Sequence, residues 1–196
     1  MAPLSGVDDR FSLGELLAGP PEEAAPRLLG CLLTSRSGDE EVVLRLTEVE
    51  AYKGEEDPAS HAYRGRTDRN GSMFEAPGTL YVYRSYGVHW CANVACGPEG
   101  VGWGVLFRAG EILEGAPVAR RRRGRATNLA IGPGNLTQAL AITGAMNGSF
   151  LLGDDSEVTL DGGPPPSVVV ATPRVGLATA TELHWRFVAA ATAAPG

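Results

Sequence analysis

The sequence predicts one domain that mixes helices with strands. A chain of 196 residues is long enough for a single domain with a sizeable core. Its content of 43% hydrophobic and 20% charged residues is typical of a globular protein and not of a disordered one. Helical and strand patterns both occur, without an internal repeat or linker. We therefore expect a single domain over residues 1–196, with flexible ends at 1–10 and 189–196.

Two helices are predicted near the start of the chain, over Phe11–Ala18 and Pro21–Leu33. In the second segment, Pro21 and the two glutamates that follow it suit a first helical turn. Pro26 is disfavoured inside a helix, so the regular part could begin only at that residue. The leucines from Leu28 onward form its apolar stripe.

A long strand is predicted over Val42–Tyr52, after a turn at Ser35–Asp39. Alternate residues of a strand share one face. The face expected here comprises Val42, Leu44, Leu46, Glu48, Glu50 and Tyr52. It is apolar at first and then acidic and aromatic, so we expect Glu50 and Tyr52 to emerge together at the rim of the core.

A polar loop at 53–71 separates this strand from three more. Loops of that length in compact domains are usually functional. The segments Gly78–Arg84 and Val88–Cys96 are predicted to pair around a tight turn at Tyr86 and Gly87. Gly87 can take the positive φ that such a turn often needs. A further strand is expected at 101–109.

The last third is predicted to contain one helix and two short strands. The basic run Arg120–Arg125 is interpreted as a solvated loop, which an acidic partner or RNA would also fit. Gly132-Pro133-Gly134 precedes a helix over Leu136–Thr143. Short strands are expected near residues 157–160 and 167–171.

Positive charge is concentrated in the middle of the chain. The net charge is −6, and Lys53 is the only lysine beside 16 arginines. Residues 61–130 hold ten basic and five acidic side chains, whereas both flanks are acidic. Because arginine favours planar, bidentate phosphate contacts, this distribution predicts a localised patch that faces phosphate.

Several protein classes are excluded by patterns that the sequence lacks. No apolar run approaches the roughly 20 residues of a membrane span, and no basic-then-apolar leader predicts a signal peptide. The three cysteines lack the short Cys-x-x-Cys spacing of zinc sites and fit reduced thiols. Walker, dinucleotide-binding and Ser-His-Asp patterns are also missing. We therefore expect a cytoplasmic monomer without metal, cofactor or membrane partner.

The tyrosines cluster in one stretch, Thr47–Asn93. All five tyrosines and two of the three histidines lie there, although aromatic residues make up only 7% of the chain. Flat aromatic faces with one carboxylate and few cations suit a planar, polar ligand that is uncharged or cationic. A nucleobase is the leading candidate, although each tyrosine taken singly fits ordinary packing better than ligand contact.

Glu50 is the candidate general base. Its position alone fits a surface glutamate at a strand end equally well. If it is buried beside Leu46 and Tyr52, it needs a partner to stay ionised, and Arg108 is the expected partner.

Three more residues fit a base-binding site. Tyr86 has little core to pack into at a hairpin tip, so we expect an exposed wedge that enters a base stack. His61 fits either a pocket or a loop in which it caps its own backbone. Asn93 lies inside a strand, where asparagine is disfavoured, which indicates a specific hydrogen bond or steric role.

Ordered motifs run along almost the whole chain. They are Glu48-Val49-Glu50-Ala51-Tyr52-Lys53-Gly54, Asp57-Pro58-Ala59-Ser60-His61, Arg69-Asn70, Met73-Phe74, Pro77-Gly78-Thr79-Leu80-Tyr81-Val82-Tyr83, Tyr86-Gly87-Val88-His89-Trp90-Cys91-Ala92-Asn93, Arg108, the Gly-Pro-Gly-x-Leu-x-x-Ala-Leu run from Gly132, Arg174-Val175-Gly176 and Trp185-Arg186-Phe187. In order and spacing they resemble the alkyladenine (3-methyladenine) DNA glycosylase family over residues 11–188.

The resemblance implies an α+β fold: a single domain with a curved, barrel-like antiparallel β-sheet, flanking helices and a protruding β-hairpin. It implies a monofunctional DNA glycosylase of base excision repair. Such an enzyme flips an alkylated or deaminated purine out of double-stranded DNA and hydrolyses its N-glycosidic bond, leaving an abasic site. The expected location is cytoplasmic, of the bacterial type and associated with the nucleoid.

The resemblance also assigns roles to residues. Glu50 activates water, which Arg108 and the backbone of Val175 help to hold. The base pocket comprises Tyr52, His61 and Tyr83 as a sandwich, with Met73, and with Asn93 excluding guanine by crowding its exocyclic amino group. Tyr86 is the minor-groove wedge. Contacts to the DNA backbone are expected from Arg64, Arg66, Arg69, Arg84, Gly134 and Asn135. The sequence departs from the family at Asn135, where relatives tend to carry a basic residue, and at Arg84-Ser85, where they are often more apolar.

Other functions stay open at this point. One is a binding module that recognises a modified base or damaged DNA without cutting it. Another is a formyl-group or nucleotide-binding domain of similar shape, which would not need a Tyr-Gly hairpin tip. The preferred lesion is also open among 3-methyladenine, 7-methylguanine, hypoxanthine, ethenoadenine and a bulky purine adduct.

Overall fold

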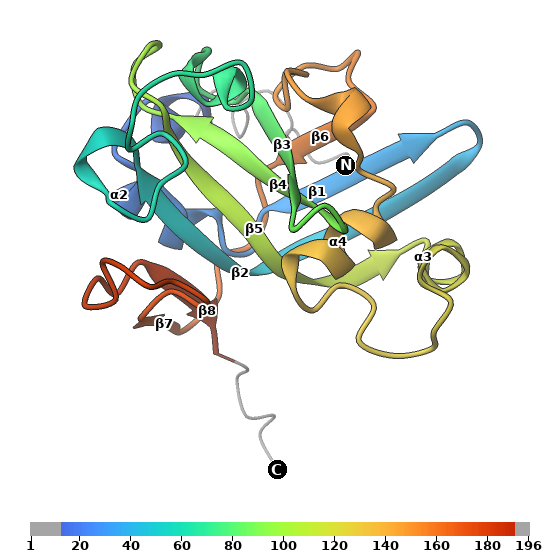
Figure 1. Ribbon diagram of the computed structural model, residues 1–196. Coiled ribbons are helices and arrows are strands. Elements are labelled where there is room, and N and C mark those ends of the chain that lie inside the picture. Colours follow the sequence, from blue (N-terminus) through green and yellow to red (C-terminus); the bar gives the residue numbers. More distant parts are fainter. Residues whose placement is uncertain (1–12, 191–196) are drawn as a thin grey trace.

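An antiparallel sheet of eight strands organises the chain (Figure 1). The computed structural model describes residues 13–190. Six strands lie in the order β3-β4-β5-β2-β1-β6, and the pair β7–β8 joins the sheet through β8 and β2. The strands are β1 (Leu32–Ser37), β2 (Glu40–Lys53), β3 (Leu80–Ser85), β4 (His89–Cys96), β5 (Trp103–Glu114), β6 (Val158–Asp161), β7 (Val169–Thr172) and β8 (Arg186–Ala189).

Short helices flank the sheet. They are α2 (Pro21–Leu28), α3 (Ala116–Arg123) and α4 (Pro133–Ala139), with 3₁₀ turns η1 (Gly54–Glu56), η2 (Gly71–Phe74) and η3 (Gly144–Met146). Residues 13–17 are also helical. The expected α+β fold, with its curved antiparallel sheet, flanking helices and protruding hairpin, is confirmed (Figure 1). Strands β2 to β7 lie close to the predicted segments, although β5 continues five residues beyond the predicted end at Ala109. Strands β1 and β8 were not predicted as strands.

Strand β2 is the axis of the sheet. One edge pairs with β5 along nearly its whole length. The other edge pairs first with β1 and then, at Glu48–Glu50, with β8. The part of β2 that carries Glu50 is therefore held on both sides by strands from distant parts of the sequence.

An irregularity in β2 changes which residues face the core. The β2–β5 register shifts on both sides of Glu48, and the pairing passes over Arg108. Leu46 is in the core before the shift, and the next core residue of the strand is Val49. Strict alternation would have placed residue 48 there instead. The prediction that every second residue from Val42 to Tyr52 lies on one face was therefore wrong. The shift turns Glu48, Glu50 and Tyr52 away from the core that Val42, Leu44 and Leu46 enter.

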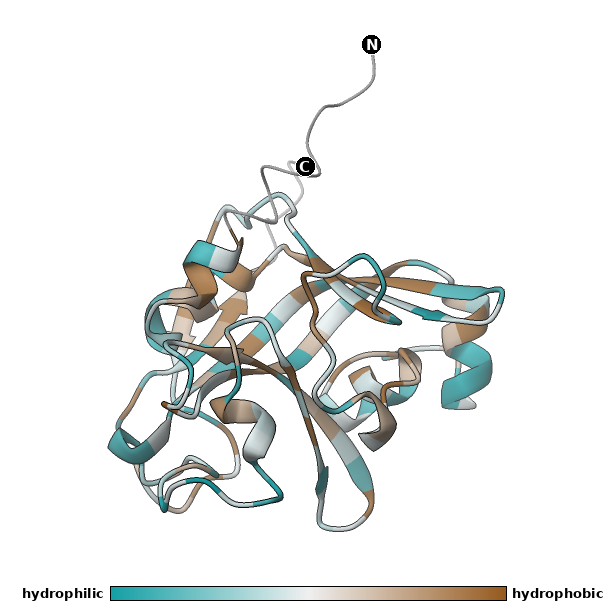
Figure 2. Cartoon of the chain, turned by 90° about the horizontal axis from the view of Figure 1, so that it is seen from above, coloured by the Kyte–Doolittle hydropathy of each residue, from teal (hydrophilic) through white to brown (hydrophobic). Residues whose placement is uncertain are grey.

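The main core lies between the sheet and helices α2 and α4. Leu33, Leu44 and Phe107 have no exposed surface there, and Leu28 of α2 and Leu136 of α4 close it from the helices. Figure 2 shows the apolar colours along the strands and the polar colours on outer loops and on the arginine-rich end of α3. Burial of apolar surface at roughly 25 cal/mol per Å² is the main stabilising force of such a core.

The second predicted helix is too long. Helix α2 ends at Leu28 and contains Pro26 instead of beginning there. Gly30 then takes φ +94°, and a Cβ at that position would lie 2.2 Å from the Pro164 oxygen. The chain turns at this glycine, so Leu32 and Leu33 belong to β1 and the predicted turn shortens to Gly38 and Asp39.

Two predictions in the last third also need correction. Arg120–Arg123 are not in a loop but in the last turn of α3. Helix α4 begins at Pro133, three residues before the predicted start, and ends at Ala139. The short strands near 157–160 and 167–171 are present as β6 and β7.

Both predicted flexible ends lie mainly outside the described residues, as do residues 11–12 of the first predicted helix. Ala189 completes β8, and the Ala190 N–H donates a hydrogen bond to the Val168 oxygen.

Candidate active site

A cavity of about 440 Å³ opens beside the second half of β2. Its walls come from strands β3, β4 and β5 and from the loops around residues 59–73 and 175–177. The predicted site residues among its lining are Tyr52, His61, Arg69, Met73, Tyr83, Tyr86, Asn93, Arg108 and Val175. Tyr81, Cys91, Leu106 and Pro133 line it too, without having been predicted. The fold therefore brings together residues up to 125 positions apart in the sequence, from Tyr52 to Leu177.

Glu50 lies directly behind this lining, with no exposed surface. Its Oε1 accepts a hydrogen bond of 2.8 Å from the Val175 N–H. Its Oε2 accepts one of 2.8 Å from the Tyr52 hydroxyl and one of 3.2 Å from Arg108 Nη1. All three donors line the cavity, so the carboxylate is directed towards it and not outward. The expected partnership of Glu50 with Arg108 is present in the structure. The Val175 N–H, which was expected to help hold the water, bonds to Glu50 itself.

A second carboxylate holds Arg108 in place. Arg108 Nε donates to Glu48 Oε1 at 2.8 Å, and Arg186 Nε donates to the same oxygen at 2.7 Å. Partial burial raises the pKa of Glu48, but the hydrogen bonds from Arg186 and Arg108 outweigh it and hold that pKa below its ordinary value. Glu48 therefore remains an anion at neutral pH and fixes the guanidinium that reaches Glu50.

A buried ion pair holds the loop that carries Val175. Arg174 donates to both oxygens of Asp57, at 2.5 and 2.9 Å, and also to the Ala51 oxygen. Both side chains of the pair have no exposed surface. Asp57 in turn accepts the Ala59 N–H at 3.1 Å. The 173–177 loop is thereby fixed to the end of β2, where the Val175 N–H meets Glu50.

Two aromatic rings form one wall. The rings of His61 and Tyr83 are in edge-to-face contact, with centroids 4.4 Å apart. Tyr81, beside them, contacts His61 Nδ1 through its hydroxyl at 3.3 Å. Burial and the positive charge of Arg69 hold the pKa of His61 below its ordinary value of 6.5. His61 is therefore neutral at neutral pH, and it can accept as well as donate a hydrogen bond.

Asn93 lies in β4 on the floor of this cavity. It is 5% exposed, and its side-chain amide donates to the Tyr81 oxygen at 3.1 Å. This hydrogen bond explains why a residue disfavoured in strands is held inside one. Met73 belongs to a small apolar cluster with Phe74 and Tyr81 that supports the same wall.

The tip of the β3–β4 hairpin carries the most exposed tyrosine. The Val88 N–H bonds to the Ser85 oxygen, and the two residues between them, Tyr86 and Gly87, have φ of +49° and +69°. A left-handed backbone costs an ordinary residue about 1–2 kcal/mol. Tyr86 is nevertheless 96% exposed, so packing does not explain its presence.

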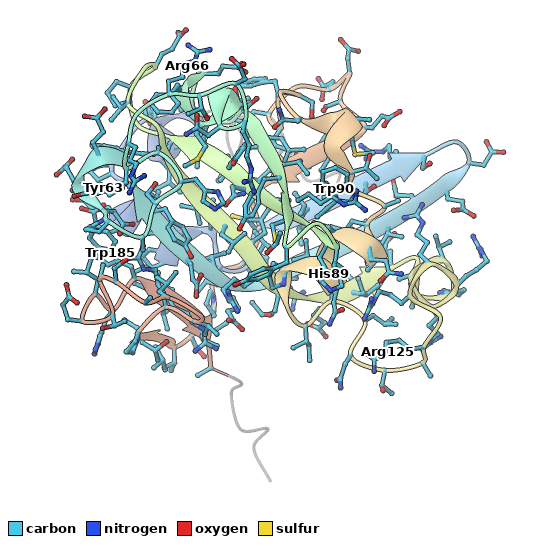
Figure 3. The ribbon with its side chains drawn as sticks, viewed as in Figure 1. Tyr63, Arg66, His89, Trp90, Arg125 and Trp185 are labelled. Atoms are coloured by element: carbon cyan, nitrogen blue, oxygen red, sulfur yellow. The ribbon has the colours of Figure 1, made fainter. Side chains whose placement is uncertain are left out.

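The arginines do not form one positive patch. Figure 3 places Arg66 and Arg125 at opposite ends of the molecule. Arg121 and Arg122 of α3 bond to Glu40, and Arg69 donates to the Arg84 oxygen. The expected single patch facing phosphate is therefore wrong for the run in α3, whose charge Glu40 partly neutralises.

The predicted backbone-contact residues occupy different settings. Arg64 and Arg66 are exposed and lie outside the cavity. The Arg84 guanidinium stacks 5.4 Å from the Trp90 ring centroid. Gly134 lies against His89, beside the hairpin turn, where a Cβ would come within 2.8 Å of His89 Cβ. The amide of Asn135 donates to the Ile131 oxygen.

Within residues 13–190, no three histidine, cysteine or acidic side chains are grouped so that they could hold a metal ion. No helix of that same part is long and apolar enough to cross a bilayer.

Sequence reasoning missed three contributors. Tyr81 was noticed only as a member of the tyrosine cluster. The roles of Glu48 and of the Asp57–Arg174 pair were missed. Glu48, Asp57 and Arg174 nevertheless belong to motifs that carry the family resemblance. Their partners are 60 to 138 positions away in the sequence, and no local pattern reveals such pairing.

Comparison with known proteins identifies the family. The sequence model of the methylpurine-DNA glycosylase family matches residues 15–193. Bacterial relatives carry the name "Putative 3-methyladenine DNA glycosylase". The one from Rhodococcus jostii is 50% identical over 190 residues, which cover 92% of this chain and 83% of the relative. The one from Streptomyces avermitilis is 48% identical over 180 residues, with 88% and 84% covered.

A third relative, from Burkholderia lata, bears the same name and is 45% identical over 170 residues, which cover 84% of this chain and 81% of the relative. The match thus extends over nearly all of the chain and includes every segment that forms the cavity. The chain therefore belongs to the methylpurine-DNA glycosylase family, and it is a hydrolase of the DNA glycosylase type.

Proposed function

We propose that this enzyme flips a damaged purine out of double-stranded DNA and hydrolyses its N-glycosidic bond, with Glu50 as the general base. The observation that carries the proposal is the buried Glu50 carboxylate, whose three hydrogen-bond donors all line an aromatic cavity. The product is an abasic site. The enzyme acts as a monomer on DNA in the cytoplasm.

The carboxylate has room for one water. An ionised carboxylate offers about four acceptor positions, and Val175, Tyr52 and Arg108 use three of those on Glu50. Glu50 has no exposed surface while the Tyr52 hydroxyl covers Oε2. The fourth acceptor position is on Oε1, which accepts only the Val175 N–H, so the attacking water binds there. Glu50 then takes the proton of the water as it attacks the sugar.

One carboxylate suffices for an alkylated purine. Most glycoside hydrolases use an acid and a base. A purine alkylated at a ring nitrogen is already cationic, so its bond to the sugar is weakened and protonation is less necessary. Glu50 both deprotonates water and stabilises the positive charge that develops on the sugar.

The cavity fits a stacked purine. Because His61 and Tyr83 touch each other, they form one wall, and Tyr52 serves as the opposite face of the sandwich. Base–aromatic stacking contributes about 1–3 kcal/mol per base. Asn93, fixed by its bond to Tyr81, crowds the position that the exocyclic amino group of guanine would take. Normal guanine is thereby excluded.

Tyr86 is the wedge that fills the space of the flipped nucleotide. We expect Tyr86→Ala to weaken binding to a lesion in a fully paired duplex more than to the same lesion in a mismatch. Unstacking and unpairing cost a few kcal/mol, and less of that work remains in a mismatch. Titration of the two duplexes measures the difference. Equal losses on both would contradict a wedge.

The enzyme is monofunctional, because none of residues 13–190 places an amine in the site. A lyase step needs an amine nucleophile. Lys53 does not line the cavity, and its ammonium pairs with Glu22 at 2.5 Å. This hydrogen bond raises the pKa of Lys53 and keeps it protonated.

We therefore expect the purified enzyme to leave abasic DNA uncut and to form no adduct on borohydride treatment. Gel analysis of a labelled lesion duplex measures both. Strand scission that disappears in Lys53→Ala would overturn the assignment.

A binding module that reads the lesion without cutting it is the second candidate. Release of free base with enzyme in excess separates the two functions. We expect release from at least one duplex in a panel that carries 3-methyladenine, 7-methylguanine, hypoxanthine or ethenoadenine. Tight binding to the panel without release from any member would favour the module.

A further inference from the structure

We propose that Arg174 sets the lesion preference of the cavity: it reduces the advantage that the Tyr52 ring would otherwise give a cationic base over a neutral purine. This inference rests on the proposed function, because it takes Tyr52 to be one face of the base sandwich. Arg174 touches no substrate and acts through the side chain of Tyr52.

Arg174 lies behind Tyr52. Its guanidinium carbon is 4.7 Å from the centroid of the Tyr52 ring and 5.3 Å from that of Trp185. Tyr52 lines the cavity, whereas Arg174 is 5% exposed and does not line it. The cation therefore occupies the ring face that is turned away from the bound base.

Its position is fixed. The two hydrogen bonds to Asp57 and the one to the Ala51 oxygen hold the guanidinium plane, and Trp185 packs on it as well. The Tyr52 hydroxyl is anchored at the same time to Glu50. The ring and the cation behind it thus form one rigid unit on the wall.

A cation behind the ring weakens its attraction for a second cation in front. The attraction of a cation for an aromatic face is worth about 0.5–2 kcal/mol and depends on the negative charge of the ring face. Arg174 stacks on the far face and already draws on that charge, and because Asp57 offsets its long-range repulsion, the effect acts through the ring itself. Dispersion and apolar contact with the base are unaffected by it. Tyr52 therefore stacks on cationic and neutral purines more equally than a bare tyrosine would.

The opposite wall has the same character. The Arg69 guanidinium lies 5.9 Å from the centroid of Tyr83 and lines the cavity. Its positive charge also contributes to the lowered pKa of His61. Both faces of the sandwich thus carry an arginine, so the aromatic rings alone do not select positively charged lesions.

The test uses the double variant Asp57→Asn/Arg174→Gln, which removes both charges of the pair together and leaves no buried ion alone. Equilibrium binding is measured to two duplexes that differ only in the lesion, 7-methylguanine as the cationic base and hypoxanthine as the neutral one. The crowding of the guanine amino group by Asn93 is the same in wild type and variant, so it cancels from the change in the ratio. Each carries a 2′-fluoro sugar that blocks release. We expect the ratio of affinities to shift about two- to tenfold towards 7-methylguanine, within the range of a cation–aromatic attraction.

A purely structural role for Arg174 gives a different result. If the pair only positions the 173–177 loop, both affinities fall by the same factor and the ratio stays constant. A constant ratio, or a shift towards hypoxanthine, would overturn the inference. Failure of the wild-type enzyme to release any base would instead overturn the proposed function, and the binding ratio does not depend on release.

A second variant keeps the test independent of the stability of the double variant. Tyr52→Leu removes the ring and leaves the Asp57–Arg174 pair in place. We expect it to weaken binding of both duplexes by nearly the same factor, because Arg174 has already reduced the preference of the ring for cations. A selective loss of 7-methylguanine binding would show that Tyr52 does favour cations despite Arg174, and would contradict the proposal.

Discussion

Glu50→Gln is expected to lower single-turnover base release by at least about a hundredfold while binding to damaged duplex remains. Positioned general acid–base catalysis typically contributes 10²–10⁴ in rate, and an amide cannot take a proton from water. In the variant, an NH₂ group, which donates hydrogen bonds, replaces one carboxylate oxygen, which accepts them. That NH₂ group faces the Val175 N–H or the Tyr52 and Arg108 donors, so the arrangement around the water is lost as well.

Glu48→Gln is the matched control. Glu48 lies two residues earlier on the same strand and also bonds to Arg108, but its other partner is Arg186, whereas Glu50 bonds to Tyr52 and the Val175 N–H. We expect a loss of less than about tenfold, because Arg108 keeps its bond to Glu50 and general-base catalysis is intact. Release by Glu50→Gln at a near-normal rate would remove Glu50 from its role. If both variants lost the same factor in the rate of base release, the effect would belong to the Glu48–Arg108–Glu50 network as a whole and not to Glu50 as the base.

Asp57→Ala is expected to lower the free energy of unfolding by about 3–5 kcal/mol. Removal of one partner leaves the other as an uncompensated buried charge, which is the costly way to break a buried pair. Arg174 has no exposed side-chain surface and keeps only its bond to the Ala51 oxygen. The Ala59 N–H also loses its acceptor. Urea denaturation followed by tryptophan fluorescence measures the change.

Glu41→Ala provides the comparison for that result. Glu41 pairs with Arg36 at 2.8 Å, but the two side chains are 45% and 50% exposed. Exposed pairs contribute about 0–1 kcal/mol, so this variant should unfold nearly as the wild type does. If Asp57→Ala were no more destabilised than Glu41→Ala, the pair would not hold the 173–177 loop as described.

The local parts of the fold were predictable from the sequence. Gly87 and the alternating segments on either side of it specify the β3–β4 hairpin, and both strands lie where they were expected. Tyr52, His61, Tyr83 and Asn93 reach the same cavity because their motifs stand on three strands of one sheet and on one loop. The resemblance supplied the rest of that constellation, since nothing in the spacing alone joins Val175 to Glu50.

The remaining errors have physical causes. Strict alternation fails in β2 because the register shift beside Glu48 is set by pairing with β5, which no local pattern encodes. Helix α3 has almost no apolar face, and only Ala119 is buried. Its arginine-rich sequence therefore looks like that of a solvated loop. The helix is held instead by side chains that reach Glu40, Gln138 and the Ala139 oxygen. Contacts of that kind become visible only once the chain is folded.

The central claim is that a purine leaves the DNA stack and lies in the cavity in front of Glu50. A crystal structure of the enzyme with a duplex that contains a 2′-fluoro damaged purine tests it most directly. The account predicts the purine between Tyr52 and the His61–Tyr83 wall, the Tyr86 ring in the gap of the stack, and one water bonded to Glu50 and facing the sugar carbon. A purine that remains stacked in the duplex, or a bound purine without water between Glu50 and its sugar, would contradict the account.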